Sequence, residues 1–228
     1  MNSDAARASS LAAAARVLVE QPTFELTLDA IARTAKEVLP GFDHVGVAVA
    51  SRSGGVETKA GTDALVWELD RLQYSVDEGP CLSALREDTV VVVPDVRHEQ
   101  RWPRYLPAAI RAGLRSQMAV RLSLDHEGPV GGLNLYSTIR DGIEAETAEL
   151  AASFATHAAI ALSRAREIAN LNDALASRKV IGQAIGIIME RYQLNEQRAF
   201  AFLVRASSHR NIKLRDIAQE LVVESNLR

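Results

Sequence analysis

The sequence predicts an α+β domain with one antiparallel sheet, followed by a long helix that leads into a small all-helical module. Alternation with period two over 44–61 and 116–137 predicts two β-hairpins, and helical patterns surround both. From Glu144 to Tyr192 there is no proline, and no glycine before Gly182, so we expect a helix of roughly 70 Å. Helices, strands, a mixed middle and further strands, in this order, are typical of an antiparallel α+β fold.

The first two helices are predicted from composition and spacing. Residues 4–20 are rich in alanine and lack glycine and proline, and Pro22 ends the helix. The next segment, "TLDAIARTAKEVLP", has apolar residues at helical spacing. We expect Thr27 to be its N-cap and Pro40-Gly41 to stop it.

The middle of the chain mixes strands with short helices. The hairpins are expected to turn at Ser53-Gly54-Gly55 and at 125–128. Between them, "DALVWELDRLQYSV" predicts a helix, "TVVVVPDV" a short buried strand ended by Pro94, and "WPRYLPAAIRAGL" a short helix ended by Gly113. One face of the second hairpin is expected to carry Met118, Val120, Leu122 and Leu124.

The long helix carries a partial stripe at alternating spacings of three and four. Its members are Phe154, Ala158, Ala161, Ala165, Ile168, Asn172 and Leu175. Small residues in such a seam favour close packing between two helices, and a polar asparagine suits a specified dimer. The alternative is two helices with an unmarked break near Asn170-Asn172. We favour the continuous helix and a homodimer with a coiled-coil-like seam.

Two short helices follow the long one. Asn195 is the expected N-cap of a helix with Phe200, Leu203, Val204 and Ser207 on one face. Asn211 marks a turn, and "KLRDIAQELVVE" predicts a third helix whose inward residues are Leu214, Ile217, Ala218 and Leu221.

Composition excludes several classes of protein. Hydrophobic residues make up 47% and charged residues 24%, and no window approaches the ~20 apolar residues of a membrane span. Cys81 is the single cysteine, so an intrachain disulfide and a multi-cysteine zinc site are excluded. We see no signal peptide and expect a cytoplasmic protein without a membrane partner.

Charge is divided unevenly along the chain. From Leu175 onward there are nine Lys/Arg against five Asp/Glu, whereas the preceding residues have seventeen against twenty-four. A basic module that meets a polyanion would explain this division. The alternative is a small helical tail that its charges merely solvate.

Residues 170–224 resemble the ANTAR domain of bacterial transcription antitermination regulators. The shared strings are "ALASRKVIGQA", "GIIMERY", the "AF…L…AS" helix and "KLRDIAQELV". The resemblance implies a three-helix bundle whose first helix continues an upstream coiled coil. It also implies binding to paired RNA hairpins in leader transcripts, which keeps a terminator from forming. Family members often have lysine where this chain has Ile185, which is expected to pack instead.

Residues 26–165 resemble a GAF domain of the version that precedes ANTAR in actinobacterial proteins. The strings that carry this are "DEGPCLSALREDTVVVVPDVRHEQRWPRY", "GLRSQMAVRLSL" and "GPVGGLNLYS". The resemblance implies a sensor of an unknown small-molecule or protein signal. We therefore expect an α+β GAF sensor domain over 1–168 and an all-α ANTAR domain over 169–228.

RNA is read mainly at unpaired bases, by cations and by polar side chains that reach base edges. Three candidates lie on the long helix, five around the end of the first of the two short helices, and two at the start of the other. The predicted RNA-binding residues are Arg178, Lys179, Arg191, Arg205, Ser208, His209, Arg210, Asn211, Lys213 and Arg215. For any one arginine, a solvated surface charge is the alternative interpretation, so the prediction concerns the cluster.

A candidate ligand pocket is expected against the sheet, by analogy with where GAF domains bind ligands. Its candidate residues are Trp67, Tyr74, Cys81, Trp102 and Tyr105. The alternative for the four aromatic residues is an ordinary core, which we favour. For Cys81, a small core residue at a helix start is favoured over a nucleophile or redox sensor.

Enzymatic and metal-dependent functions find little support. The five histidines are far apart, no HExxH pattern occurs, and neither phosphate-binding glycine motif is present. We expect no catalytic residues, no metal and no cofactor. Two rival functions stay open: a protein-interaction regulator whose basic tail binds an acidic protein, and a small-molecule sensor, with His44 and His98 as conceivable haem ligands.

The stretch "KVIGQAIGIIMERY" has two glycines four residues apart inside an expected helix. An exposed helix would lose roughly 1 kcal/mol at each relative to alanine. The apolar part is too short for a membrane dimer motif. We expect Gly186 to allow close packing within the bundle, so that Gly186→Leu disrupts it, and Gly182→Ala to be mild or stabilising.

Overall fold

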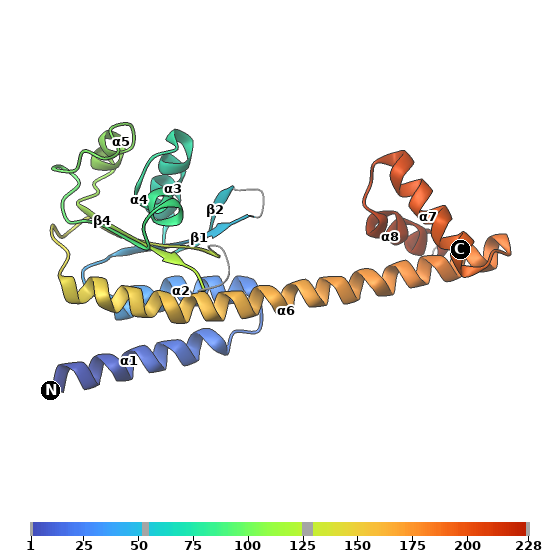
Figure 1. Cartoon of the computed structure of the whole chain (residues 1–228), viewed down its shortest axis with the longest axis horizontal. Helices are drawn as coiled ribbons and strands as arrows, with labels where there is room; N and C mark the ends of the chain where they lie inside the picture. The colour runs from blue at the N-terminus through green and yellow to red at the C-terminus, as the bar shows by residue number, and fades with distance from the viewer. Residues whose placement is uncertain (1, 52–54, 125–129, 227–228) are drawn as a thin grey trace. The chain divides into compact units, whose positions relative to one another are not determined.

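The computed structural model describes residues 2–51, 55–124 and 130–226, and it divides into two compact units, Met1–Arg166 and Glu167–Arg228 (Figure 1). The strands are β1 His44–Ala50, β2 Val56–Gly61, β3 Val90–Val93, β4 Ser116–Leu122 and β5 Gly131–Ser137. The helices of the first unit are α1 Asn2–Val19, α2 Phe24–Val38, α3 Ala64–Val76, α4 Pro80–Arg86 and α5 Leu106–Arg111. Helix α6, Ala145–Tyr192, passes from the first unit into the second, which also holds α7 Glu196–Arg210 and α8 Leu214–Asn226.

The described strands form one five-stranded sheet in the order β2-β1-β5-β4-β3, and every neighbouring pair is antiparallel. This confirms the predicted fold class and both predicted hairpins. The predicted turns at Ser53-Gly54 and at 125–128 lie outside the described residues. Strand β3 ends at Val93, directly before Pro94, as expected, but it lies at the edge of the sheet and only alternate residues are buried.

The two faces of the sheet carry different layers, as Figure 1 shows: α2 and the first part of α6 cover one face, and α3 and α4 cover the other. Alternation in β1 explains the division. Val45, Val47 and Val49 pack with the α2 and α6 side, whereas Ala48 packs with α4 on the other side. Between them, Gly46 lies so close to α3 that an added Cβ would be 2.5 Å from Val66 Cγ1. Glycine is therefore what allows α3 to approach the sheet.

The predicted N-cap Thr27 is wrong. Helix α2 begins at Phe24, because Thr23 has extended backbone angles and its side chain accepts a hydrogen bond from the Leu26 amide at 3.2 Å. Thr27 is buried inside the helix, where its hydroxyl donates to the Thr23 carbonyl at 2.8 Å. Thr23 and Thr27 both have a hydroxyl that could cap a helix, and the packing of the folded chain decides which of them does.

Helix α6 is continuous over 48 residues, so the alternative break near Asn170-Asn172 is absent. The predicted seam divides into two parts. Phe154, Ala158 and Ala161 are buried within the first unit against the sheet, and they are not available to a second chain. Ile168 and Leu175, with Leu171 between them, are exposed by 44, 63 and 57%.

The second unit is a three-helix bundle with a small core, as predicted. Its buried residues are Ala184, Ile188, Ala199, Leu203, Ile217 and Ala218, and Ile185 packs against them. Asn195 caps α7 by accepting a hydrogen bond from the Arg198 amide at 3.0 Å, and Asn211 ends it with a left-handed backbone.

The expected close packing at Gly186 is wrong for this chain. A Cβ added at Gly182 or at Gly186 would meet no atom within 4 Å, and both glycines face outward. Neither glycine is therefore required by the packing of the described bundle. Among the described helices, none is both long enough and apolar enough to cross a membrane.

Candidate ligand pocket and nucleic-acid interface

A cavity of about 470 Å³ lies between the edge strand β2 and helix α3 in the first unit. Its lining residues are Val56, Glu57, Thr58, Ala64, Trp67, Glu68, Arg71 and Tyr74. Those from α3 recur at spacings of three and four, so one face of that helix forms the wall. Asp63 fixes where the wall begins, because its side chain caps α3 by accepting from the Leu65 amide at 3.1 Å.

Hydrogen bonds link the inner end of this pocket to the buried carboxylate of Asp70. The hydroxyls of Thr58 and Tyr74 lie 3.1 Å apart, and Thr58 donates to Asp70 Oδ2 at 2.5 Å. Asp70 Oδ1 accepts from Asn134 Nδ2 at 2.8 Å and from the Tyr136 hydroxyl. Burial raises the pKa of Asp70 to about 6, although these hydrogen bonds act in the opposite direction.

This arrangement couples the pocket to the sheet. The Thr58 hydroxyl, which lines the pocket, donates to Asp70, and Asp70 in turn accepts from Asn134 and Tyr136 of β5. The half-exposed Trp67 ring supplies a flat apolar wall. The pocket thus suits a small molecule with an apolar part and a hydrogen-bonding group.

The structure brings together only two of the five predicted pocket residues, Trp67 and Tyr74. Cys81 is buried behind the pocket wall, with its Sγ 3.9 Å from the Tyr74 hydroxyl. Burial, and next the nearby Asp70, raise the pKa of this thiol to about 12. A thiol that is protonated at neutral pH is a poor nucleophile, so the geometry favours the core role for Cys81.

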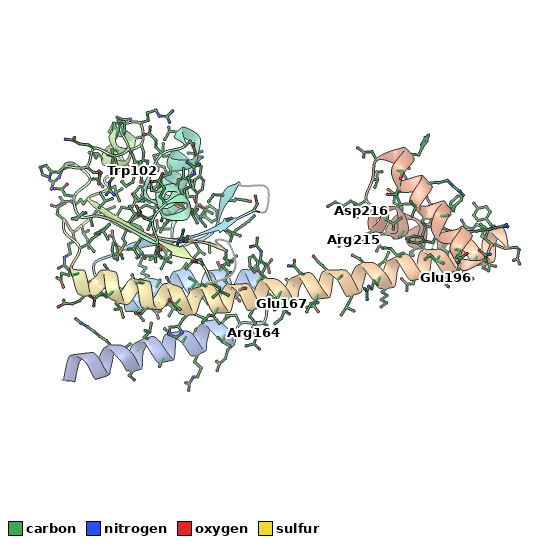
Figure 2. The ribbon with its side chains drawn as sticks, viewed as in Figure 1. Trp102, Arg164, Glu167, Glu196, Arg215 and Asp216 are labelled. Carbon is green, nitrogen blue, oxygen red and sulfur yellow. The ribbon has the colours of Figure 1, made fainter. Side chains whose placement is uncertain are left out.

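Trp102, which Figure 2 labels, and Tyr105 are buried in a core formed with α3, α4 and α5, and they do not line the pocket. Trp102 Nε1 donates to Ser83 Oγ at 3.1 Å, and the Tyr105 hydroxyl donates to Gln117 Oε1 at 2.8 Å. Their hydrogen bonds and burial make them structural aromatic residues. The sequence interpretation missed Asp70, although an acidic residue on the buried face of the 63–76 helix was a detectable signal.

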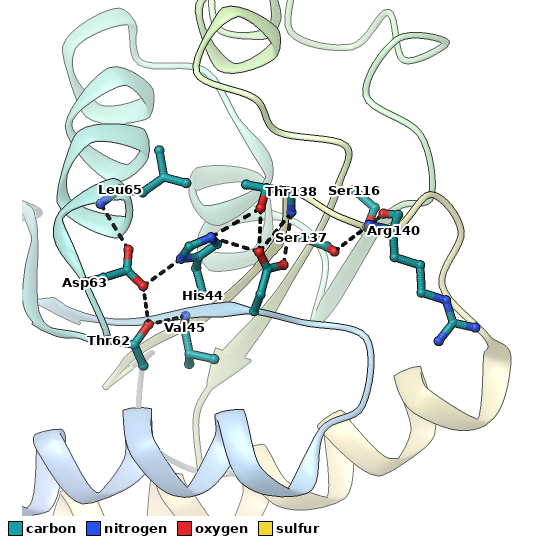
Figure 3. Close-up of polar contacts among 10 residues, drawn as sticks. His44, Val45, Thr62, Asp63, Leu65, Ser116, Ser137, Thr138 and Arg140 are labelled. Carbon is teal, nitrogen blue, oxygen red and sulfur yellow. Dashed lines mark hydrogen bonds and ion pairs between the residues drawn. The ribbon is translucent and has the colours of Figure 1, made fainter.

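His44 is enclosed by two carboxylates at the start of β1 (Figure 3). Its Nδ1 lies 2.6 Å from Asp63 Oδ2, and its Nε2 lies 2.9 Å from Asp43 Oδ2. Because both ring nitrogens have carboxylate partners, His44 is not free to ligate a haem iron. His98 is exposed and contacts Asp95 at 3.0 Å on a different loop, so the structure does not bring the two histidines together as a haem pair.

The ten predicted RNA-binding residues all lie in the second unit, and all but one are exposed. Arg178 and Lys179 lie in the middle of α6, and the half-buried Arg191 is in its last turn. Arg205, Ser208, His209 and Arg210 follow the C-terminal half of α7, Asn211 is its C-cap, and Lys213 and Arg215 flank the start of α8. The turn at Asn211 brings the α7 and α8 groups to one end of the helix pair.

Two of these cations already have acidic partners. Arg210 pairs with Glu220 across α7 and α8, with contacts of 2.5 and 3.3 Å, and Arg215 lies 3.7 Å from Asp216 (Figure 2). The other cations of the set form no ion pair with a side chain in the described part of the second unit. Arg205 and Lys213 are therefore the members of the α7–α8 group whose charge is available for an external anion.

Two family models match the chain. The GAF domain model matches residues 21–163, more than half of the chain, and the ANTAR domain model matches residues 169–222. No curated protein matches the chain significantly.

Solved structures with the same fold are distant in sequence. The GAF domain from a phosphoenolpyruvate-protein phosphotransferase of Coxiella burnetii is 15% identical, with a TM-score of 0.58 over 72% of this chain and 96% of that one. The free methionine-R-sulfoxide reductase of Neisseria meningitidis, solved with its substrate, is 18% identical, with a TM-score of 0.52 over 71% and 91%. The GAF domain region of a Geobacter sulfurreducens PCA membrane protein is 16% identical, with a TM-score of 0.51 over 61% and 93%. Such identities show a shared fold alone.

Proposed function

We propose that this chain, which belongs to the GAF family and continues into an ANTAR domain, is a signal-responsive regulator that binds RNA and prevents transcription termination. The observation that carries the proposal is the ANTAR match over 169–222. The same segment exposes Arg205 and Lys213, which have no acidic partner among the described residues. Paired hairpins in leader transcripts are the proposed target. The protein acts in the cytoplasm, where such transcripts are made, and it catalyses no reaction.

The signal enters at the first unit in this proposal. The pocket beside Trp67 and Tyr74 is the proposed receptor of a small molecule, because its hydroxyls are linked to the buried Asp70. Strand β5, which carries partners of Asp70, is covered by α6 on its other face. Helix α6 is continuous to Tyr192, so it is the covalent path along which a change in the sensor reaches the ANTAR domain.

A homodimer is the proposed functional state, and the proposed type of protein is the actinobacterial GAF–ANTAR regulator. Ile168, Leu171 and Leu175 support it, because they expose apolar surface at the spacing of a coiled-coil seam. A dimer would hold two ANTAR domains for two hairpins. Sedimentation of the whole chain beside an Ile168→Glu/Leu175→Glu variant tests the seam: the wild type should sediment as a dimer and the variant as a monomer.

The experiment for RNA binding begins with crosslinking in the host and sequencing of the bound RNA. Leader transcripts recovered in this way are then used in gel shifts with the whole chain. Affinity should fall steeply with salt, because each phosphate contact releases counterions. Arg205→Ala and Lys213→Ala should each weaken binding and reduce the salt slope by about one contact. Arg111→Ala, an exposed cation on α5 of the first unit, is the matched control and should change nothing.

The rival function is a protein-interaction regulator whose basic second unit binds an acidic protein. Affinity purification from the host that recovers one stoichiometric acidic protein, and no RNA, would establish this rival and refute the RNA proposal. If the Arg205→Ala variant then no longer recovered this acidic protein, the same surface would bind a protein and not RNA.

A further inference from the structure

An exposed aromatic pair lies at the junction of α6 and α7. The ring centroids of Tyr192 and Phe202 are 5.7 Å apart and their planes are tilted by 31°. Tyr192 is 53% exposed and Phe202 is 41% exposed, so much of the ring surface is open to solvent. Burial does not explain this pair, because the buried core of the bundle is formed by small and aliphatic residues.

The pair is flanked by cations on one stripe of α7. Arg198, Phe202, Arg205 and His209 follow one another at spacings of four, three and four, and all four are exposed. At 3.6 residues per turn these positions share one face of the helix. Neither Arg198 nor Arg205 forms an ion pair with any described side chain of the second unit. The face thus combines an aromatic surface with two uncompensated guanidinium groups.

This combination has a specific chemistry. Aromatic rings between cations form the surface on which proteins stack unpaired bases while neighbouring arginines contact the phosphates. A paired helix offers no unstacked base to such a surface. An acidic protein would pair with the arginines, but it has no nucleobase to stack on the rings.

We infer that Tyr192 and Phe202 form a stacking platform for an unpaired base of an RNA loop, with Arg198 and Arg205 on the adjacent phosphates. The inference rests on the proposed RNA binding and adds what is recognised, namely loop bases. The face that recognises them shares Arg205 with the basic group near the α7–α8 turn. Arg205 belongs to both surfaces. On this face, the affinity for RNA thus comes from contacts with the bases of the loop and not from contacts with the stem.

The chain offers a matched control on the same helix. Phe200 is 44% exposed, nearly the same as Phe202, yet it lies about 160° around the axis of α7 from Phe202. Phe202→Leu removes the planar ring from the platform, and Phe200→Leu makes the same chemical change on another face. Phe202→Trp keeps a stacking ring and should preserve binding.

The test uses the whole chain and the leader transcript fragment recovered by crosslinking, with one loop adenine replaced by 2-aminopurine. A second RNA has the same stems with the loops closed into continuous duplex. The wild type should bind the looped RNA and change the 2-aminopurine emission. Phe202→Leu and Tyr192→Leu should bind it about tenfold or more weakly and lose the emission change. All variants should bind the duplex equally, and Phe200→Leu should behave as the wild type.

The outcomes separate the two proposals. A wild-type protein that binds no transcript overturns the proposed function, and this inference with it. A wild type that binds, while Phe202→Leu and Tyr192→Leu lose no affinity for the looped RNA, overturns the platform alone. Equal losses in Phe200→Leu and Phe202→Leu also overturn it, because the effect would then not belong to this face. Circular dichroism of each variant shows whether α7 stays folded.

Discussion

The two units differ in whether they bury or expose their polar and aromatic residues. The first unit buries Asp70, Gln73 and Asn134 in one hydrogen-bonded network and places Tyr105 and Tyr136 in the core. The second unit exposes its three aromatic residues and forms its core from small and aliphatic side chains. A buried polar network depends on every partner being in place. A small core leaves aromatic and cationic surface for contact with another molecule. The difference agrees with the proposed division of roles, in which the first unit senses a signal and the second contacts RNA.

Leu203→Ala should have the largest effect, because it removes a buried side chain from a core in which only six of the described residues are buried. The expected loss is on the order of 3 kcal/mol, which is comparable with the whole stability of so small a bundle. Hydrogen exchange should show loss of protection over α7 and α8, with the strands of the first unit unchanged.

Val204→Ala is the control, since Val204 lies next to Leu203 on the same helix and is 38% exposed. Simultaneous loss of protection in both units after Leu203→Ala would break the comparison, because the units would then unfold as one cooperative system through α6. Equal effects of the two substitutions would show that the small core does not hold the bundle.

Asp70→Asn tests the buried network of the first unit. The pKa of Asp70 is raised to about 6 by burial, so the folded chain binds this proton more tightly than the unfolded chain. Its contribution to stability is therefore present below about pH 4 and is lost as the pH rises through about 6, by about 3 kcal/mol in total. Asparagine does not titrate. The stability difference between variant and wild type should thus shift in favour of the variant by about that amount from pH 4 to pH 7.5.

Urea unfolding followed by tryptophan emission measures this effect cleanly. Both tryptophans, Trp67 and Trp102, lie in the first unit, so the signal reports that unit alone. A stability difference that is constant with pH would show that Asp70 does not change its proton affinity on folding. The link from the pocket to strand β5 would then lack its titrating group.

Asp63→Asn should have a smaller effect with the opposite pH dependence. Burial raises the pKa of Asp63, but hydrogen bonds from His44 and Thr62 outweigh it and leave the pKa below its ordinary value. Its stabilisation is therefore present above the ordinary carboxyl pKa and is lost as the pH falls through the lowered one. Asparagine can still cap α3 through its oxygen, but the charge is removed and its amide nitrogen cannot accept from His44 and Thr62 as Asp63 Oδ2 does. Asp63 is partly exposed, and the expected cost near pH 7 is below about 1 kcal/mol.

The same urea titration, repeated near pH 7 and near pH 3, measures this cost. It should be present near pH 7 and shrink toward zero near pH 3. A cost that persists at the lower pH would mean that the amide disturbs the cap of α3, and that the carboxylate contact with His44 contributes little.

The sequence predicted those features of the fold that depend on local patterns along the chain. Alternating valines in "HVGVAVA" indicated β1, and the unbroken stretch after Glu144 indicated α6, because both depend on spacing along the chain. The candidate site depended on contacts across the fold. Trp102 and Trp67 have the same chemistry in the sequence, yet one is buried in a core and the other lines the pocket. Likewise, Phe202 is paired with Tyr192 only because the turn after α6 folds α7 back, which no periodicity indicates.

Gly182→Ala and Gly186→Ala should have the smallest effects, and both should stabilise the chain. Each glycine lies inside α6 with no atom within 4 Å of an added Cβ, so alanine gains up to about 1 kcal/mol of helix propensity without a clash. Thermal melts followed by circular dichroism, with the exposed neighbour Gln183→Ala as control, measure this gain.

The two glycines leave open backbone on the outward face of the ANTAR domain. A loss of stability that depends on protein concentration would show that a second chain approaches there. Raised stability with weakened RNA binding would show that the RNA does, which would extend the contact surface of the second unit beyond the aromatic stripe.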